Sequence, residues 1–560
     1  MARKQATQTE RWSPPLAGLA VFLLTIAVCG LRLGSPGLIE PDEARYAAVG
    51  QAMWTGGDFV TPRLNGFVYL DKPPLLHWLT ALSIGLFGPH EFAVRLSSLL
   101  AAAAGVALTY AFGRRVFGHH AGIASAAVLA TSALWFAVGR TIRYDMLLTL
   151  AVTATIWWAW LGSEGGREGR RYYCYAAVAA GLGVLVKGPI ALALPVFILL
   201  PYFALTRRLS SLLQVPWLAV LGILAAVTAP WFALCEHANP GAIRFFLLHE
   251  NLARVKGEID AGHQQPWWYL GPILLGACWP WTLFLPGAVL DGVGGRRHGE
   301  EPQRRACVLW LLWVAVPLVF FSLSKVKVVT YILPCLPPVG LLIGRYVSPA
   351  RRRGLWAAIA TGILLNGAAA AIVFVKLNEP LPIAVKPVAV IWALAGLEVI
   401  AAAILRARKW AVALLAVSLL ASYHVLLWSA GRNPGFPSDK ALAQKVAELR
   451  KPGERILSVR QLSRGTVFYL NERVAVFGNA PAEYDFPANR GKLDGWVHPI
   501  DDAARVLAKG PPAIIVCRHP YWEEFQAAAG DSVTEIAHTD RAVILRSVRA
   551  RAPAAAGNAP

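Results

Sequence analysis

The sequence predicts a polytopic α-helical membrane protein with about 13 transmembrane helices, followed by a small C-terminal α/β domain. Of the 560 residues, 56% are hydrophobic and only 16% are charged, and the mean hydropathy is +0.48. A soluble chain of this length does not combine such a composition with repeated long apolar runs. From about Pro434 the composition changes to short β-rich runs that alternate with helical patterns.

The predicted membrane-spanning helices are apolar segments of roughly the 17–25 residues that cross a bilayer. The pair on either side of Lys187-Gly188-Pro189 also fits one long broken helix. The first segment follows basic residues, as a signal peptide does, but it lacks a small-x-small cleavage site, so we expect an uncleaved anchor. The segments lie near 15–33, 92–113, 120–139, 146–162, 172–187, 188–205, 214–236, 267–290, 307–323, 328–346, 355–376, 385–405 and 408–428.

Clusters of arginine occupy alternate connections between these segments. They contribute to a formal charge of +21, from 54 Lys+Arg against 33 Asp+Glu, and their dispersal along the chain argues against a nucleic-acid-binding surface. Under the positive-inside rule this side is cytoplasmic. The first loop, Asp145, Lys187, the stretch 237–266 and the C-terminal domain then lie on the opposite side. The seven cysteines lack metal-binding spacing and predict no disulfide framework.

The loop between the first two predicted spans carries the densest charged motif. Glu40-Pro41-Asp42-Glu43-Ala44-Arg45-Tyr46 opens it, and Tyr69-Leu70-Asp71-Lys72-Pro73-Pro74 closes it. Pro41 suits the first position of a helix, and Asp42 and Glu43 complement the positive end of its dipole. Residues 75–87 are too few to span and fit a second interfacial helix. Because charges beside lipid are costly, we expect this loop to carry the chemistry.

The C-terminal region predicts a small α/β domain with a mostly parallel sheet. We expect Ser438 to cap a helix that runs through Arg450. The domain boundaries are then 1–430 for the membrane domain, 431–550 for the α/β domain and 551–560 for a disordered Ala/Pro-rich tail. No Gly-rich phosphate loop is present, so no nucleotide cofactor is expected. The β-rich runs are 456–459, 474–477, 513–517 and 542–545, and helical patterns at 500–508 and 521–529 separate them.

Two acidic positions are candidate catalytic residues. Asp42 lies in the first loop and Asp145 follows Arg143-Tyr144 in another loop predicted on the same side. Two carboxylates from separate loops that face one cleft are typical of glycosyl transfer or hydrolysis. Glu43 is a third candidate, but a purely structural role at the start of the helix fits it equally well.

Cationic and phenolic side chains on the same side are candidate phosphate ligands. Lys72 is followed directly by two prolines, which restrict its backbone. Lysine binds phosphate as a point charge. Attraction to lipid head groups is the alternative for these cations. Asp71 and His263 are candidate ligands of a divalent, zinc-like metal, but a catalytic site usually takes at least three protein ligands. The remaining candidates for the phosphate are Arg45, Arg254, Tyr331 and Tyr69, with Lys187, Lys325 and Lys327 as further cations.

These motifs, together with residues 246–254 and 327–334, resemble those of the bacterial lipid A 4-amino-4-deoxy-L-arabinose transferases. That group is similar to the protein O-mannosyltransferases and shares their GT-C membrane fold. The resemblance covers about the first 430 residues. Asp71 departs from it, because relatives often have Glu before Lys-Pro, and the shorter side chain weakens a metal site that depends on it.

The resemblance implies a reaction and its partners. An undecaprenyl-phosphate-linked aminosugar would donate its sugar to a phosphate of lipid A at the periplasmic face of the inner membrane, which confers resistance to polymyxin and other cationic peptides. Asp42 would sit at the reaction centre with Asp145 nearby. Lys72, helped by Arg45, Arg254 and Tyr331, would hold the departing phosphate. No cofactor is required.

Two alternatives stay open. The first is an enzyme of the same fold that uses a polyprenyl-phosphate sugar but a protein or glycan acceptor. The second is a lipid-linked sugar transporter or flippase, although such proteins usually carry inverted repeats and interrupted helices near the midplane. The sequence shows no such repeat in its motifs, and most of its ionisable residues lie in the predicted outer loops.

Overall fold

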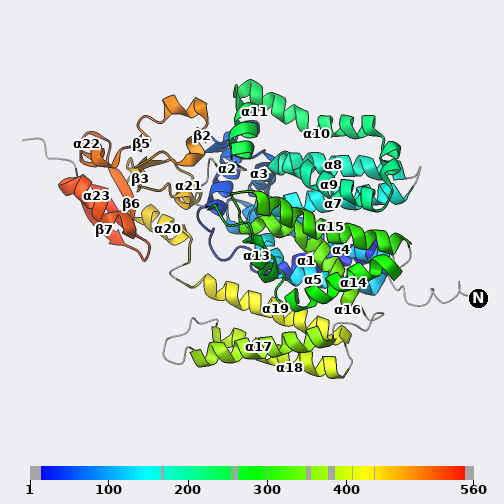
Figure 1. Ribbon diagram of the computed structural model, residues 1–560. Coiled ribbons are helices and arrows are strands. Elements are labelled where there is room, and N and C mark those ends of the chain that lie inside the picture. Colours follow the sequence, from blue (N-terminus) through cyan, green and yellow to red (C-terminus); the bar gives the residue numbers. More distant parts are fainter. Residues whose placement is uncertain are drawn as a thin grey trace, which may run out of the picture. The chain divides into compact units, whose positions relative to one another are not determined.

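The computed structural model describes residues 14–165, 169–253, 256–257, 263–298, 301–348, 355–375, 385–405, 408–433 and 436–548. The chain divides into two compact units, each built from segments far apart in the sequence (Figure 1). Unit 1 contains Met1–Ser35, Arg95–Leu234 and Phe246–Ala430. Unit 2 contains Pro36–Val94, Cys235–Phe245 and Gly431–Pro560. The predicted tail, 551–560, lies outside the described residues.

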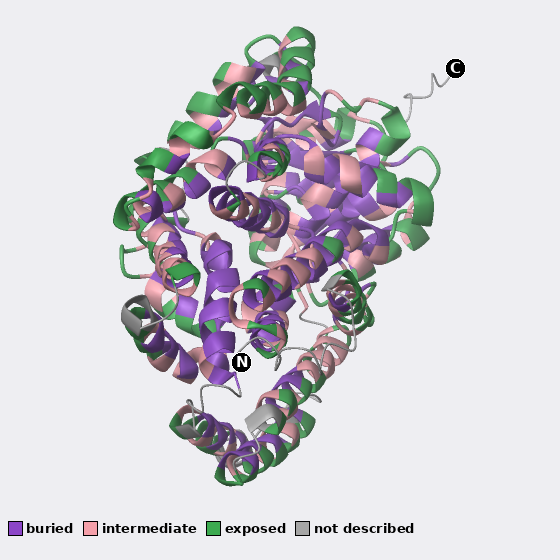
Figure 2. Cartoon of the chain, turned by 90° about the vertical axis from the view of Figure 1, so that its right-hand side faces the viewer, coloured by how far each residue is buried: buried purple, intermediate pink, exposed green. Residues whose placement is uncertain are grey.

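Unit 1 is helical. Its longer helices carry mostly apolar residues, and several of them leave a large part of that surface exposed (Figure 2). The helices are α1 (Pro14–Cys29), α4 (Glu91–Phe117), α5 (His119–Thr131), α6 (Ala133–Gly139), α7 (Tyr144–Glu164), α8 (Arg170–Lys187), α9 (Ile190–Leu205), α10 (Trp217–Ala238), α13 (Leu270–Ala277), α14 (Leu285–His298), α15 (Glu301–Leu323), α16 (Leu336–Val347), α17 (Leu355–Val375), α18 (Val385–Ile404) and α19 (Arg408–Ala430), with a π-helix at Phe245–Ala253 and short 3₁₀ helices at Leu209–Gln214, Trp281–Phe284 and Val329–Cys335.

Within the described residues, 7 helices are long and apolar enough to cross a membrane, or up to 9 if each of two bent pairs counts as one span. The segments predicted at 120–139 and 267–290 are these bent pairs, with angles of 67° between α5 and α6 and 106° between α13 and α14. Hydropathy did not predict these bends because both halves of each pair are apolar. The break at Gly188-Pro189 separates α8 from α9, as two helices and not one.

In unit 2 the first loop folds into two helices and a hairpin. Helix α2 (Asp42–Gly56) begins one residue later than predicted, because Pro41 occupies the N-cap position. Helix α3 (Leu75–Phe87) has the predicted bounds. Between them, β1 (Arg63–Leu64) and β2 (Phe67–Val68) pair antiparallel around Asn65-Gly66. Both turn residues have positive φ, 53° and 85°, as a two-residue hairpin turn of the Asn-Gly type requires.

The rest of unit 2 is a six-stranded mixed sheet in the order β5-β4-β3-β6-β8-β7. Strands β5, β4, β3 and β6 run parallel, whereas β8 is antiparallel to both β6 and β7. Four strands lie where the sequence predicts them, and the edge strands β5 and β7 were not predicted. The elements are α20 (Lys440–Leu449), β3 (Arg455–Val459), α21 (Arg464–Leu470), β4 (Val474–Phe477), β5 (Val497–His498), α22 (Ala503–Lys509), β6 (Ala513–Arg518), α23 (Trp522–Ala529), β7 (Val533–His538) and β8 (Ala542–Ser547), with short turns at Ala242–Arg244, Ala482–Tyr484, Pro487–Lys492, Ile500–Asp502, His519–Tyr521 and Gly530–Ser532.

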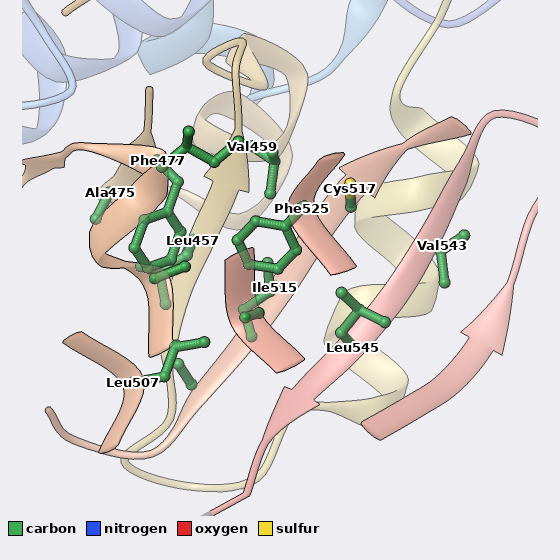
Figure 3. Close-up of a cluster of buried hydrophobic side chains, with 14 residues drawn as sticks. Leu457, Val459, Ala475, Phe477, Leu507, Ile515, Cys517, Phe525, Val543 and Leu545 are labelled. Carbon is green, nitrogen blue, oxygen red and sulfur yellow. The ribbon is translucent and has the colours of Figure 1, made fainter. Parts of the chain in front are cut away.

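One face of this sheet packs against α22 and α23. The Phe477 and Phe525 rings lie 5.4 Å apart between centroids, with Leu457 and Ile515 beside them (Figure 3). Because alternate strand residues point to this face, the cluster forms one apolar core.

The capping expectation for α20 was wrong in one respect. Asp439, and not Ser438, holds the N-cap position, and its buried carboxylate accepts hydrogen bonds from Ser463 Oγ at 2.7 Å and from Arg518 Nη2 at 2.9 Å.

Two buried asparagines join the first loop to the C-terminal domain inside unit 2. Asn65 Nδ2 donates to the Val474 carbonyl at 2.7 Å, and Asn65 Oδ1 accepts from the Val474 N–H at 2.8 Å. In the reverse direction, Asn489 Oδ1 accepts from the Val68 N–H at 3.1 Å and Asn489 Nδ2 donates to the Val68 carbonyl at 2.8 Å. Each amide therefore satisfies the two backbone groups of a residue on the other segment. By these contacts Pro36–Val94 groups with the C-terminal domain, whereas a division at residue 430 would separate them.

Replacement of Asn489 by Ala should destabilise unit 2. The change leaves the N–H and carbonyl of Val68 without their partner in a buried position, and each unsatisfied group costs about 1–3 kcal/mol. We expect a loss of about 2 kcal/mol or more in the free energy of unfolding, followed by denaturant titration of the purified protein in detergent. Gln526→Ala, an exposed change on α23, is the control and should have no measurable effect. Equal stability of the two variants would contradict this account.

Candidate active site

Asp42 and Arg45 form the charged start of α2 in unit 2. They lie one helical turn apart, and Arg45 Nη2 donates to Asp42 Oδ1. The Asp42 side chain remains 28% exposed, so its carboxylate is accessible from outside the unit. Arg45 Nη1 donates in the other direction, to Glu483 Oε1 at 3.2 Å. The guanidinium is thus shared between two carboxylates.

Glu43 has the contacts of a structural residue. It is completely buried, and its Oε2 accepts from the Ile39 N–H at 2.9 Å, while its own N–H donates to the Ile39 carbonyl at 3.1 Å. These two bonds fix the chain as it turns into α2. Of the two roles that the sequence allowed for Glu43, this geometry favours the structural one.

Glu40, at the opening of the motif, is tied to α21. Its Oε1 accepts from the Gly465 N–H, and its own N–H donates to the Pro437 carbonyl at 2.8 Å. Burial and the neighbouring Asp439 carboxylate raise the pKa of Glu40 to about 8. The first residues of the motif therefore rest against the C-terminal domain before Asp42 begins the helix.

Lys72 and its neighbours close the first loop. Lys72 is half-buried, and its Nζ donates to the Asp71 carbonyl at 2.7 Å, while Pro73 and Pro74 are buried behind it. Tyr69 is almost completely buried, with its ring 6.0 Å from that of His77. Burial lowers the pKa of His77 to about 3, so this ring is neutral. Lys72 thus provides a fixed positive charge near the N-terminus of α3.

The second candidate carboxylate, Asp145, belongs to unit 1. It lies in the first turn of α7, where its Oδ1 accepts from Lys187 Nζ at 2.5 Å and its Oδ2 from Thr330 Oγ1 at 2.9 Å. Lys187 Nζ lies 4.9 Å from the centre of the Tyr331 ring. The structure therefore brings together Asp145, Lys187 and Tyr331, which the sequence had placed in three separate loops.

Lys325 and Lys327 lie beside the short stretch that contains His263. Lys327 is buried, and its Nζ donates to the carbonyls of Ser324 and, at 2.7 Å, Gln265. Its charge is therefore used to hold two segments of unit 1 together. Lys325, in contrast, is exposed and helps to line a cavity of about 480 Å³. The other lining residues are Gln264, Gln265, Trp267, Ser322, Leu323, Ser324 and Lys327.

The remaining candidates are the metal ligands and Arg254. Asp71 belongs to unit 2, whereas His263 belongs to unit 1, where its side chain is exposed. Among the described residues, no group of three or more His, Cys, Asp or Glu side chains is arranged to hold a metal ion. Arg254 lies outside the described residues.

Comparison with known proteins identifies the family. Residues 71–233 match the family model described as dolichyl-phosphate-mannose-protein mannosyltransferase. The chain is 36% identical over 384 residues to the undecaprenyl phosphate-α-4-amino-4-deoxy-L-arabinose arabinosyl transferase of Pseudomonas aeruginosa strain UCBPP-PA14, which covers 67% of this chain and 67% of that protein. The chain belongs to the family of undecaprenyl phosphate-α-4-amino-4-deoxy-L-arabinose arabinosyl transferases. Its arabinosyl transferase relative from P. aeruginosa strain PAO1 is 38% identical over 358 residues, or 62% of this chain and 63% of that protein.

Solved structures show the fold of the arabinosyl transferase family. The crystal structures of ArnT from Cupriavidus metallidurans, bound to undecaprenyl phosphate and in the apo state, match with TM-scores of 0.79 and 0.80. Each match covers 96% of this chain, with 24% identity. The protein is therefore a polytopic helical membrane protein with the ArnT form of the GT-C fold.

The Asp145–Lys187 pair should be needed for the stability of unit 1. Lys187→Met removes the cation that is hydrogen-bonded to the buried Asp145 carboxylate and leaves the bond from the neutral Thr330 hydroxyl. Breaking a buried ion pair by removing one partner costs about 3–5 kcal/mol. We expect a loss of about 3 kcal/mol, whereas the double change Asp145→Asn with Lys187→Met should lose less. Lys445→Met, which breaks an exposed pair with Glu448, is the control. An equal loss in the single and double variants, measured by thermal unfolding in detergent, would refute the pairing argument.

Proposed function

We propose that this protein transfers 4-amino-4-deoxy-L-arabinose from undecaprenyl phosphate to phosphate groups of lipid A, at the periplasmic face of the bacterial inner membrane. Resistance to polymyxin and other cationic peptides is the expected consequence. The observation that carries the proposal is the 36% identity over 384 residues to an undecaprenyl phosphate-α-4-amino-4-deoxy-L-arabinose arabinosyl transferase, whose name gives this donor.

In the proposed reaction the bond between the sugar C1 and the donor phosphate oxygen breaks, and its electron pair leaves with undecaprenyl phosphate. A lipid A phosphate oxygen then forms the new bond to C1. Because this acceptor is already ionised, the reaction needs no strong base. Positive charge that develops on the sugar ring would be stabilised by the Asp42 carboxylate, which could also orient the cationic amino group.

The departing phosphate requires fixed positive charge. We assign this role to Lys72, because the buried prolines behind it hold its backbone and it lies in the same unit as Asp42. Arg254, Tyr331 and Tyr69 remain candidate donor ligands, and Asp145, held by Lys187 and Thr330, is the proposed second carboxylate. Asp71 and His263 stay the candidate metal ligands if transfer responds to a chelator.

The proposal includes a topology of 13 spans with a cytoplasmic N-terminus. The 7 long spans and two bent pairs among the described residues support it, as do the shorter apolar helices, which include α1, α9 and part of α17. Helix α8, which begins with two arginines and is not among these apolar helices, is the thirteenth span that we propose. The arginine clusters then lie on one side, and the first loop and C-terminal domain on the other.

Loss of the Asp42 carboxylate or of the Lys72 ammonium should abolish transfer. We expect Asp42→Asn and Lys72→Ala each to lower the rate by about 100-fold or more, the cost of removing one preorganised electrostatic group. The measurement is transfer to lipid A by purified enzyme in detergent, with mass spectrometry of lipid A from cells that carry each variant. Asp531→Asn and Lys509→Ala are matched controls, because both residues are exposed in the C-terminal domain.

The outcomes separate the alternatives. Normal transfer by both Asp42→Asn and Lys72→Ala would refute the assigned site. An unchanged lipid A in cells with the wild-type protein would favour a protein or glycan acceptor. Movement of the donor across a vesicle membrane without cleavage of the sugar–phosphate bond would favour a transporter.

Topology can be tested by thiol labelling. Gly56 ends α2 on an exposed surface, and a Cβ added there would meet nothing within 4 Å. We expect Gly56→Cys to react with a membrane-impermeant maleimide in spheroplasts. Arg115→Cys, exposed in a predicted cytoplasmic cluster, should react only after permeabilisation. The reverse pattern would place the first loop in the cytoplasm and refute the proposed orientation.

A further inference from the structure

Both terminal nitrogens of the Arg45 guanidinium donate to carboxylates, and these come from two different parts of the chain. Its Nη2 donates to Asp42 Oδ1 and lies 3.5 Å from the Tyr46 hydroxyl, and its Nη1 donates to Glu483 at 3.2 Å. The side chain is only 19% exposed, and Nε is buried without an acceptor among the described residues. Because the guanidinium is a rigid planar fork, a partner that fixes one terminal nitrogen also fixes the direction of the other.

Glu483 is a buried carboxylate that fixes the orientation of the Arg45 guanidinium. It lies in the turn Ala482–Tyr484 of the C-terminal domain, with its side chain 5% exposed. Its Oε1 also accepts from Arg464 Nε at 2.8 Å, so two guanidinium groups neutralise one carboxylate. Burial alone would raise the pKa of Glu483, but Arg464 and Arg45 outweigh it and hold the pKa below its usual value. Glu483 is therefore an anion at neutral pH.

The turn that carries Glu483 is anchored to the first loop next to this ion pair. The Tyr484 hydroxyl accepts from Asn65 Nδ2 at 2.8 Å, and the Tyr484 carbonyl accepts from Asn489 Nδ2 at 3.3 Å. The Phe67 and Tyr484 rings lie 4.5 Å apart. The position of Glu483 is thus set by the same contacts that join the two segments of unit 2.

We propose that Glu483 is a positioning residue for the Asp42 carboxylate and acts on it through Arg45. This inference rests on the proposed function of Asp42. Without Glu483, the Arg45 fork can turn so that both terminal nitrogens bind Asp42, or it can move away from it. Either change displaces the carboxylate, and a displacement of about 1 Å at a reacting group costs roughly 100-fold in rate. The C-terminal domain therefore contributes to the site through one buried anion.

The proposal gives Arg45 a different role from the one that the sequence suggested. Each terminal nitrogen of Arg45 already donates to a carboxylate, so a donor phosphate at this guanidinium would compete with Asp42 and Glu483. If Arg45 nevertheless bound the donor phosphate, removal of the competing Glu483 anion would change the KM for the donor. If Arg45 orients Asp42, the same change would lower kcat and leave KM near its original value.

The test compares Glu483→Gln with wild type as full-length proteins purified in detergent, with the undecaprenyl-phosphate aminosugar as donor. We expect kcat to fall by about 10- to 100-fold, with the donor KM within about twofold of wild type. Glu483→Asp keeps the charge and should recover part of the lost kcat. Glu524→Gln breaks an exposed ion pair with Arg460 in the same domain and should leave both constants unchanged.

A second readout does not depend on activity. Amide hydrogen exchange should increase in the peptide that contains Asp42, Arg45 and Tyr46 in Glu483→Gln, and not in Glu524→Gln. Unchanged kcat in Glu483→Gln, or a changed donor KM at constant kcat, overturns the proposal. Faster exchange throughout the C-terminal domain, with no recovery in Glu483→Asp, also overturns it in favour of a general role in folding. If wild type transfers no aminosugar, the proposed function fails, and the exchange comparison alone decides whether Glu483 positions α2.

Discussion

The Arg45 guanidinium, held between Asp42 and Glu483, is the interaction on which the candidate site depends. Removal of the Arg45 guanidinium and the Glu483 carboxylate from water costs several kcal/mol unless each finds a partner. With Asp42 and Arg464 the set contains two anions and two cations. Because the Glu483 and Arg464 side chains lie in the C-terminal domain, the first turn of α2 acquires its geometry only when that domain is in place. The partly exposed Asp42 is the member of this set that can face a substrate.

In unit 1 the candidate carboxylate Asp145 is also held by an ion pair. Asp145 accepts hydrogen bonds from the cation Lys187 and the neutral donor Thr330, and the aromatic face of Tyr331 lies against the lysine. The end of α8 presents Lys187 because Gly188, with a φ of 77°, stops the helix there, and the Phe246 ring packs where a Cβ would lie. Asp145 is thus bound directly by residues from distant segments, whereas Asp42 is bound by Arg45 of the same helical turn, which the distant Glu483 holds in turn.

Periodicity and composition were sufficient for the elements but not for the contacts between them. The four predicted strands are hydrophobic runs, and α3 is bounded by prolines and glycine, so both patterns could be read directly. Strand β7 was missed because it lies at an edge of the sheet and none of its residues is buried. The hairpin was missed although Asn65-Gly66 is a strong turn signal. The bends at Ser132 and near Pro280 leave no trace in hydropathy, since apolar residues continue through them.

Single polar residues in loops were the hardest part of the site to predict. Glu483 and Asn489 belong to no repeating pattern, and their importance comes from burial and from partners some four hundred positions away. Asp42, Lys72 and Asp145 could be found because they lie in dense charged motifs beside apolar segments. The residues that support them, Glu483 and Asn489, do not lie in such motifs. The family resemblance covered only the first 430 residues and so did not include the region that contains Glu483.

Unit 2 is assembled from segments that are far apart in the sequence, and this affects the order in which its parts are synthesised. The ribosome releases Arg45 and Asn65 long before Glu483 and Asn489, and the helices of the membrane part from α4 to α19 are synthesised in between. During that interval the buried amide and the guanidinium lack the partners that they have in the folded chain. The reactive loop can therefore mature only in a fully translated molecule, so a prematurely terminated product would remain inert in the bilayer and would not consume the lipid-linked sugar.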